Sequence, residues 1–395
     1  MTDLEKKSQE LFRLYEKLDE VDEEADQVQS TDLVAGKSLE SIYAASQWRL
    51  MWRKFIRNKV AIAGGVIVLL FYVGALFAPF IAPYGLTERF AKYIYMPPQR
   101  VHFFHDGEFQ PFVYDVKLAI DENLRKTYEP NQEKIIPLEF FVPGEPYKLL
   151  GFIETDIHLF QVPNGIVSLL GTDRQGRDMF SRVLFGSQIS LTIGLVGVLI
   201  SLVIGSVLGV ASGYYGGRVD NLIQRLIELV RSFPSIPLWM ALSAAVPPHW
   251  PPLRTYFVVT LILSLIGWTW LARQLRGKVL ALRDQEFISA AKLAGASDSR
   301  IIFRHLIPAT IGHTIVVATL AMPSMILAET ALSFLGLGLR PPITSWGVLL
   351  KEVQNLQSIA LYPWVFSPGI VIAIVILAFN FLGDGLRDAS DPYTV

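Results

Sequence analysis

The residue types that most often carry chemistry form no familiar catalytic pattern in this chain. Gly36, Lys37 and Ser38 look like the end of a phosphate-binding loop, but Thr31 stands where such a loop needs a glycine. The zinc-protease pattern HExxH, the hydrolase pattern GxSxG and a dinucleotide fingerprint after a strand are missing from the sequence. We therefore expect no catalytic residue and no bound cofactor, so any ATP used must be bound by another subunit.

Histidines and cysteines give no metal signal either. His102, His105 and His158 fall within one segment, but their spacing matches no metal-ligand motif, so we expect no metal site. The absence of cysteine excludes disulfides, iron–sulfur clusters and thiol catalysis.

The composition is that of a membrane protein. The 395 residues are 51% hydrophobic and 18% charged, and the mean hydropathy is +0.38. A net charge of -1 argues against nucleic acid as a partner, because phosphate binding needs a basic surface. The first apolar run begins near Val60 behind an acidic leader, so we expect no cleaved signal peptide.

About six apolar runs approach the roughly 20 residues that cross a bilayer. They are approximately Val60 to Phe80, Ile189 to Ser212, Leu222 to Val246, Tyr256 to Ala272, Thr310 to Leu337 and Trp364 to Leu382. The third run is the least clean, because Arg225, Glu228 and Arg231 recur on one helical face near its start.

Basic residues set the expected orientation, because cytoplasmic flanks are enriched in Lys and Arg. They gather before the first span and around the segment between the fourth and fifth spans, at Arg49, Arg53, Lys54, Arg57, Lys59, Arg273, Arg276, Lys278, Arg283, Lys292, Arg300 and Arg304. An even number of spans places both flanks and both termini on one side, which we expect to be the cytoplasm of a bacterial or archaeal cell.

Four regions follow along the chain. Residues 1–47 form an acidic cytoplasmic extension, either an exposed helix that packs on a partner or a solvated terminus. Residues 48–81 hold an interfacial helix, with aromatic and basic faces, and the first span. Residues 82–180 are expected to form a small α+β insert outside the cytoplasm and a helix before the second span. Residues 181–395 hold the remaining spans and a polar loop at 276–308.

A stripe of small residues marks one face of the second span. Its members are four residues apart: Gly197, Ser201, Gly205, Gly209 and Gly213. In lipid, close approach at small residues supplies much of the contact energy between helices. We favour a contact within this chain over one with a partner subunit.

The polar loop contains a helix, a glycine bend and a second helix. Glu286 to Ala294 reads as a short helix that Gly295 terminates, and Ser297 reads as the N-cap of the next. Arg304 and His305 fall in the last turn of that second helix, and Pro308 follows it. Because so short a helix is marginal in water, its Ala-rich face needs a docking partner.

This segment resembles the EAA loop of ABC importer permeases. The loop pattern of Glu-Ala-Ala, three residues, Gly, nine residues and Ile-x-Leu-Pro falls on Ser289, Ala290, Ala291, Gly295, His305, Leu306, Ile307 and Pro308. Ser289 replaces the Glu and His305 the first Ile, as in the dipeptide/oligopeptide branch. Three further stretches resemble the C-type subunit of that branch: GTDRQGRDMFSRVLFGSQISL, AETALSFLGLGLRPPITSWG and NFLGDGLRDASDPY.

The resemblance implies an all-α integral membrane protein with the type I, MetI-like permease fold, in the cell membrane. It implies a heterodimer with a B-type permease, two subunits that bind ATP and Mg, and an extracytoplasmic binding protein that delivers peptides. The ATPase-coupling residues would be Glu286, Phe287, Ser289, Ala290, Ala291, Gly295, Arg304, His305 and Pro308.

Two further sets of charged residues leave alternatives open. Asp173, Arg177 and Asp178 either anchor the second span or contact the binding protein. Glu329, inside the fifth span, should face a cavity or a cation, either lining the pathway or pairing structurally. Arg231, at the inner end of the third span, is its distant candidate counterpart or snorkels to the interface.

Three other functions are alternatives to a peptide importer. A secondary transporter should show an inverted repeat and paired intramembrane carboxylates, and a membrane-embedded enzyme a convergent catalytic set; neither feature is visible. An importer of oligosaccharides or nickel is a closer alternative, because the same branch serves those solutes.

Overall fold

The computed structural model describes residues 47–120, 126–247 and 249–390 of the chain. The chain divides into two units, the first ending at Arg57 and the second beginning at Asn58. In the first unit, α2 (Gln47–Arg57) forms the expected amphipathic helix, where the rings of Trp52 and Phe55 stack with centroids 5.9 Å apart. Residues 1–46 of the predicted acidic extension lie outside the described residues.

Five helices in the described residues of the second unit are long and apolar enough to span a membrane. They are α3 (Lys59–Leu76), α5 (Met179–Tyr215), α8 (Pro252–Leu282), α11 (Ile307–Phe334) and α14 (Ser367–Ser390). A short 3-10 turn, η2 (Pro363–Phe366), leads into α14. Asn58 caps α3, since its side chain accepts a hydrogen bond from the Ala61 amide at 3.1 Å.

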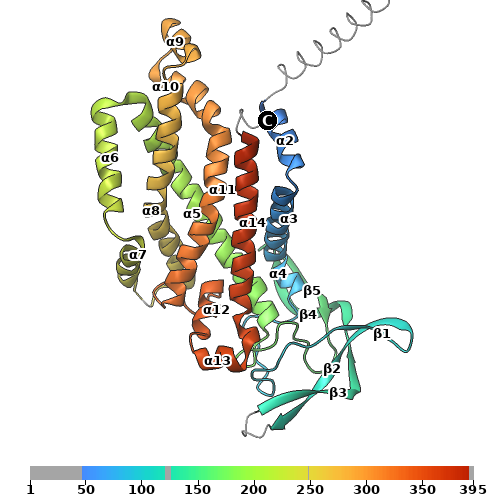
Figure 1. Ribbon diagram of the computed structural model, residues 1–395. Helices are drawn as coiled ribbons and strands as arrows, with labels where there is room; N and C mark the ends of the chain where they lie inside the picture. Colours follow the sequence, from blue (N-terminus) through green and yellow to red (C-terminus); the bar gives the residue numbers. More distant parts are fainter. Residues whose placement is uncertain (1–46, 121–125, 248, 391–395) are drawn as a thin grey trace, which may run out of the picture. The chain divides into compact units, whose positions relative to one another are not determined.

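The expectation of a single third span was wrong. The run from Leu222 to Val246 is divided into α6 (Gly217–Arg231) and α7 (Ser235–Ala244). Pro234 lies in the break with an extended backbone, and proline both lacks an amide hydrogen and disfavours helix in the residue before it. The two shorter helices together return the chain to the other end of the bundle (Figure 1).

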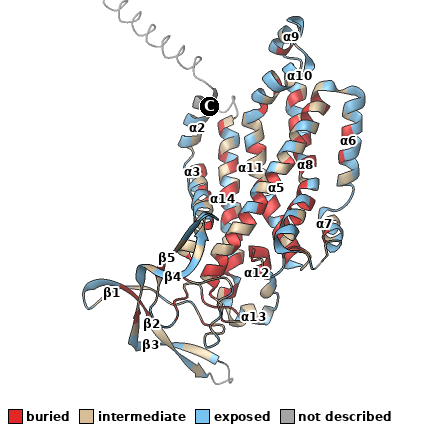
Figure 2. Cartoon of the chain, turned by 180° about the vertical axis from the view of Figure 1, so that it is seen from behind, coloured by how far each residue is buried: buried red, intermediate tan, exposed pale blue. Residues whose placement is uncertain are grey.

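The second unit therefore has two distinct ends. The start of α3 and the end of α14 lie at one end, which we call the loop end (Figure 1). The two short helices of the polar loop, α9 (Glu286–Leu293) and α10 (Asp298–Ile301), lie at the same end. The strands lie at the opposite end with α12 (Trp346–Glu352) and α13 (Leu356–Leu361), and we call it the insert end. Buried residues follow the inner sides of α5, α8, α11 and α14, which form the core (Figure 2).

Small residues on α5 permit close packing inside the chain. A Cβ added to Gly209 would lie 2.6 Å from the carbonyl oxygen of Ala272 on α8, and Gly205 and Gly213 meet the same helix as closely. Gly197 faces Met325 of α11, and Ser201 donates a hydrogen bond to the Ser264 carbonyl at 3.1 Å. The stripe thus joins α5 to two neighbouring helices.

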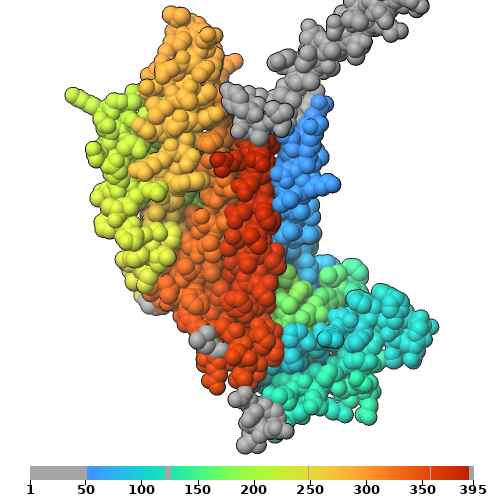
Figure 3. All heavy atoms as spheres, in the orientation of Figure 1, coloured from blue at the N-terminus to red at the C-terminus, as the bar shows by residue number. Residues whose placement is uncertain are grey.

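Among its described residues from 82 to 178, the insert forms strands and no helix. The expected α+β insert is therefore corrected to one built of strands. The strands β1 (His102–His105), β2 (Glu108–Ile120) and β3 (Lys126–Pro137) form one antiparallel sheet. A separate hairpin pairs β4 (Glu139–Leu149) with β5 (Ile153–Gln161). A short helix, α4 (Ala78–Ile81), links α3 to this insert, which projects to one side of the bundle (Figure 3).

Candidate functional site

The polar loop at the loop end begins with α9 (Glu286–Leu293), followed by Ala294 as its C-cap. Gly295 then takes a left-handed backbone, with φ of +77°. Its amide donates to the Lys292 carbonyl and the Ala296 amide donates to the Ala291 carbonyl, both at 3.0 Å. This pair of bonds is the Schellman termination, so the expected glycine stop is present.

The second helix of the loop starts as expected but does not end as expected. The side chain of Ser297 accepts a hydrogen bond from the Arg300 amide at 3.4 Å and caps α10 (Asp298–Ile301). A π-helical turn, η1 (Ile302–Leu306), then leads directly into α11, with Pro308 in the first turn of that helix. The predicted helix end before Pro308 is wrong, because the wider turn accommodates a residue without an amide hydrogen.

The loop has a buried and an exposed side. Ile288, Ile301 and Leu306 are fully buried against Val210 of α5 and Val279 of α8. On the outward side, Leu293 is 91% exposed, Phe303 70% and Phe287 43%. Glu286, Ser289, Ala290, Arg304 and Pro308 are exposed, whereas Ala291 and His305 are half-buried. The expected exposed Ala-rich face is therefore corrected at Ala291, and the anchoring Ile288 and outward Leu293 were not singled out from the sequence.

Polar contacts fix the base of the loop. The Tyr214 hydroxyl, near the end of α5, donates to Asp298 at 2.7 Å, and the Lys292 ammonium lies 5.5 Å from the same ring. Below them, Arg276 of α8 donates two hydrogen bonds of 2.6 Å to Asp220 of α6. Tyr214 of α5 therefore contacts both α9 and α10, and the Arg276 pair joins α8 to α6.

Glu329 is fully buried in α11 among hydroxyl groups. Its Oε1 accepts hydrogen bonds from Ser333 and Ser345, each at 2.7 Å, and its Oε2 accepts one from Ser190 at 3.3 Å. Ser190 and Ser345 also accept hydrogen bonds from the backbone of the segment that starts α12. The expectation of a cation or cavity beside Glu329 is therefore corrected. Three serine hydroxyls donate to the carboxylate instead, and they join α5, α11 and the start of α12.

Arg231 is not brought to this carboxylate. It ends α6, about 22 Å along a 15-residue helix from the turn after α5, and is exposed at the break before α7. Its expected position at the inner end of a span is therefore corrected. A cleft of about 240 Å³ opens elsewhere, between α5, α7, α8 and α11, and its lining includes Ser201, Trp239, Trp270, Ser324 and Met325.

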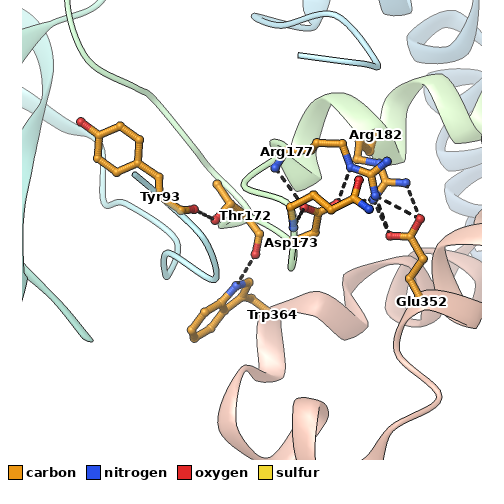
Figure 4. Close-up of polar contacts among 8 residues, drawn as sticks. Tyr93, Thr172, Asp173, Arg177, Arg182, Glu352 and Trp364 are labelled. Carbon is orange, nitrogen blue, oxygen red and sulfur yellow. Dashed lines mark hydrogen bonds and ion pairs between the residues drawn. The ribbon is translucent and has the colours of Figure 1, made fainter. Parts of the chain in front are cut away.

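At the insert end, two arginines and two carboxylates form a buried ion-pair network (Figure 4). Arg182, with 3% of its side chain exposed, donates two hydrogen bonds of 2.8 and 2.9 Å to Glu352 of α12 and one to Asp173. Arg177 donates to Asp173 at 2.7 Å and to Glu352 at 2.9 Å. The network ties the start of α5 to α12 across more than 160 residues of sequence.

The geometry supports the anchoring role of the charged residues before the second span. Asp178 is the N-cap of α5, where its Oδ2 accepts from the Ser181 amide at 2.7 Å and its Oδ1 from the Ser168 hydroxyl at 2.6 Å. Burial raises the pKa of Asp178, outweighing the hydrogen bonds that lower it. Asp173 and Asp178 are 4% and 3% exposed, so neither carboxylate offers a surface to a binding protein in this conformation.

Glu352 was not singled out from the sequence. Burial acts to raise the pKa of this carboxyl, but the hydrogen bonds and charges of Arg182 and Arg177 outweigh it and hold the pKa below its ordinary value. Nearby, the Trp364 indole donates to the Thr172 carbonyl at 3.1 Å, and the Thr172 hydroxyl donates to the Tyr93 carbonyl (Figure 4). The described residues gather no three His, Cys, Asp or Glu side chains as a metal site.

Comparisons with known proteins show the family of this chain. Residues 205–394 match the family described as the binding-protein-dependent transport system inner membrane component, and residues 46–98 match the N-terminal TM domain of oligopeptide transport permease C. The dipeptide transport system permease protein DppC of Bacillus subtilis (strain 168) is 32% identical over 86% of this chain and 84% of its own length. The chain belongs to this family of transport permeases.

Two further similarities were found. The glutathione transport system permease protein GsiD of Pectobacterium atrosepticum is 31% identical over 87% of this chain and 91% of its own length. A chain of the inward-facing MetNI methionine ABC transporter superposes with a TM-score of 0.41 at 18% identity, covering 53% of this permease and 97% of that chain. The family match confirms the expected permease fold and a multi-pass membrane subunit of a transport system.

Proposed function

We propose that this permease imports peptides that an extracytoplasmic binding protein delivers. Support comes from its relatives, which are named as dipeptide, oligopeptide and glutathione transport permeases. In the proposed assembly, a homologous B-type permease completes the pathway and two partner subunits bind ATP with Mg. The loop end and both termini lie in the cytoplasm, and the insert lies outside.

The observation that carries the coupling proposal is the two-sided loop. Ile288 anchors α9 in the bundle, while Leu293 and Phe287 project outward from the same helix. An exposed apolar pair on a rigidly held helix is a docking surface. ATP-driven closure of the partner subunits moves α9, and the base formed with Tyr214 and Asp298 carries that movement to α5.

The docking role is tested by Leu293→Ser, which removes an outward side chain without touching a contact inside the loop. Burying a leucine is worth about 1.5–3 kcal/mol, so its loss weakens ATPase association roughly tenfold or more. Substrate-stimulated ATP hydrolysis should fall in the assembled complex. The matched control is Leu253→Ser, a leucine 67% exposed at the start of α8. Equal stimulation in both variants refutes the docking role.

Orientation has its own test, because the chain has no cysteine of its own. A cysteine replacing Lys292 on α9 should react with a membrane-impermeant maleimide only after the cell membrane is opened. Reaction in intact cells would place the loop end outside and overturn the proposed direction of transport.

The cleft between α5, α7, α8 and α11 is the proposed wall of the pathway in this chain. Its lining includes no charged side chain and combines indoles with serine hydroxyls, which suits a solute recognised by its peptide backbone. Modification of Ser324→Cys by a maleimide should block uptake. Continued uptake by the fully labelled complex would exclude this cleft from the pathway.

A further inference from the structure

The β4–β5 hairpin carries an unusually apolar tip for a segment outside a bundle of helices. At the tip, Phe152 is 74% exposed, Ile153 44% and Leu150 42%; farther along the strands, toward the base, the hairpin also exposes Phe140, Phe141 and Ile157. Large aromatic groups gathered on a two-stranded hairpin indicate a surface that something covers.

The tip lies beside the spanning helix α3. Lys148, Leu150 and Gly151 line one cleft of about 310 Å³ with Tyr72 and Leu76 of α3. Leu76 ends that helix and Tyr72 lies one turn before it. The tip therefore lies beside the last turn of α3 and reaches about 6 Å back along the helix from its end. Nearer the base of the hairpin, the ring of Phe141 lies 6.2 Å from that of Phe80 on α4.

Polar contacts hold the base of the hairpin to the chain around α4. The ring nitrogens of His158 lie 3.1 Å from the carbonyl oxygens of Ala82 and Glu145. Gln161 donates to the Pro83 carbonyl at 3.1 Å. A fixed base sets the depth of the tip relative to α3.

We propose that this tip is embedded in the bilayer, at the boundary between headgroups and acyl chains on the insert end. The outward residues of α3 at this level, Leu69, Leu70, Val73 and Leu76, are exposed and apolar, so the tip continues a surface suited to lipid. Aromatic rings favour this boundary. The unpaired edges of a two-stranded hairpin keep it from deeper hydrocarbon, where free backbone groups are costly.

Charge also favours lipid over a protein partner. Between residues 148 and 154 the charged side chains are Lys148 and Glu154, which pair with each other at 3.1 Å across the strands. The tip therefore has no net charge with which to recognise an acidic or basic surface. The inference rests on α3 spanning the membrane and is independent of the transported solute.

The test uses nitroxide spin labels on single cysteines in the full complex in lipid nanodiscs. Phe152→Cys and Leu150→Cys report on the tip, and Leu69→Cys on α3 serves as the lipid reference. The aqueous reference is Leu118→Cys, a strand leucine 54% exposed on β2, which lies farther from α3 than β4 and β5 do (Figures 1 and 2). Collisions with oxygen report lipid, and collisions with a nickel chelate report water.

Both tip labels should show the high ratio of oxygen to nickel accessibility seen at Leu69→Cys. A ratio like that at Leu118→Cys would place the tip in water and overturn the proposal. Exclusion of both reagents, with an immobile label, would overturn it in favour of coverage by the partner permease. Agreement between the two tip positions guards against a local effect of one substitution.

Discussion

Replacing Glu352 with Gln tests whether the buried ion-pair network holds the insert end together. The substitution keeps the shape of the side chain but leaves the guanidiniums of Arg177 and Arg182, 11% and 3% exposed, with the single carboxylate of Asp173. Removing one partner from a buried ion pair costs about 3–5 kcal/mol, because the remaining charge stays buried. We expect a loss of about 3 kcal/mol, near the low end, because the amide oxygen still accepts one hydrogen bond.

The assay is thermal unfolding of the purified complex, followed through the accessibility of a single cysteine introduced at a buried position, because the chain has none of its own. A loss of this size lowers the Tm by several degrees. The matched control is Glu133→Gln, which breaks the Lys117 pair, whose side chains are 62% and 88% exposed. Exposed pairs contribute about 0–1 kcal/mol, so the control should leave the Tm nearly unchanged.

The pH dependence supplies a second reading of the same variant. The pKa of Glu352 is lower in the folded chain than in the unfolded one, where it is about 4.3. Its contribution to stability is therefore complete above that value and is lost as pH falls through the folded pKa. The Tm gap between wild type and Glu352→Gln should be constant near neutral pH and narrow below about pH 4. Equal Tm values at neutral pH, or a gap that widens in acid, would refute this account.

Three further substitutions test other parts of the chain. Gly209→Leu should lower the free energy of unfolding by about 1–3 kcal/mol and reduce the yield of folded complex, because α8 leaves no space for a side chain. The control is Gly277→Leu, whose Cβ would meet nothing within 4 Å. Glu329→Gln should reduce the yield of complex, because one buried hydroxyl loses its acceptor, which lowers the free energy of unfolding by about 1–3 kcal/mol. Uptake per complex should stay normal. Lost uptake at full yield would instead support the pathway role. Gly295→Ala should lower substrate-stimulated ATP hydrolysis, because a left-handed backbone costs alanine about 1–2 kcal/mol and loosens the end of α9; full stimulation would show that the bend is not needed.

The sequence predicted those features that depend on local rules. Apolar length located the five long helices, and the terminating role of Gly295 and the capping role of Ser297 followed from residue type and neighbours. The failures also have local causes. Pro234 divides a run that is long enough for a single span, and a π-helical turn allows Pro308 to continue a helix instead of ending it.

Contacts between distant residues could not be predicted in this way. Glu352 is one carboxylate in an apolar stretch, and nothing in its spacing indicates that Arg182, 170 residues earlier, lies within hydrogen-bond distance. The serines around Glu329 come from three separate segments, so the sequence predicted a buried charge that needs partners without identifying them. The strands of the insert were partly visible from their composition, but their depth beside α3 follows from tertiary packing alone.

One helix joins the two polar networks of the bundle. The helix α5 runs without interruption for 37 residues, about 55 Å, which exceeds the thickness of the hydrocarbon core. Near one end, Tyr214 holds the loop that carries α9, and near the other, Arg182 holds α12. Its glycine face is packed closely against α8 at Gly205, Gly209 and Gly213, in the half of the helix nearer the loop. In the proposed coupling, a long helix braced in this way would move as a rigid body, so a push by the partner subunits on the loop would reach the insert end.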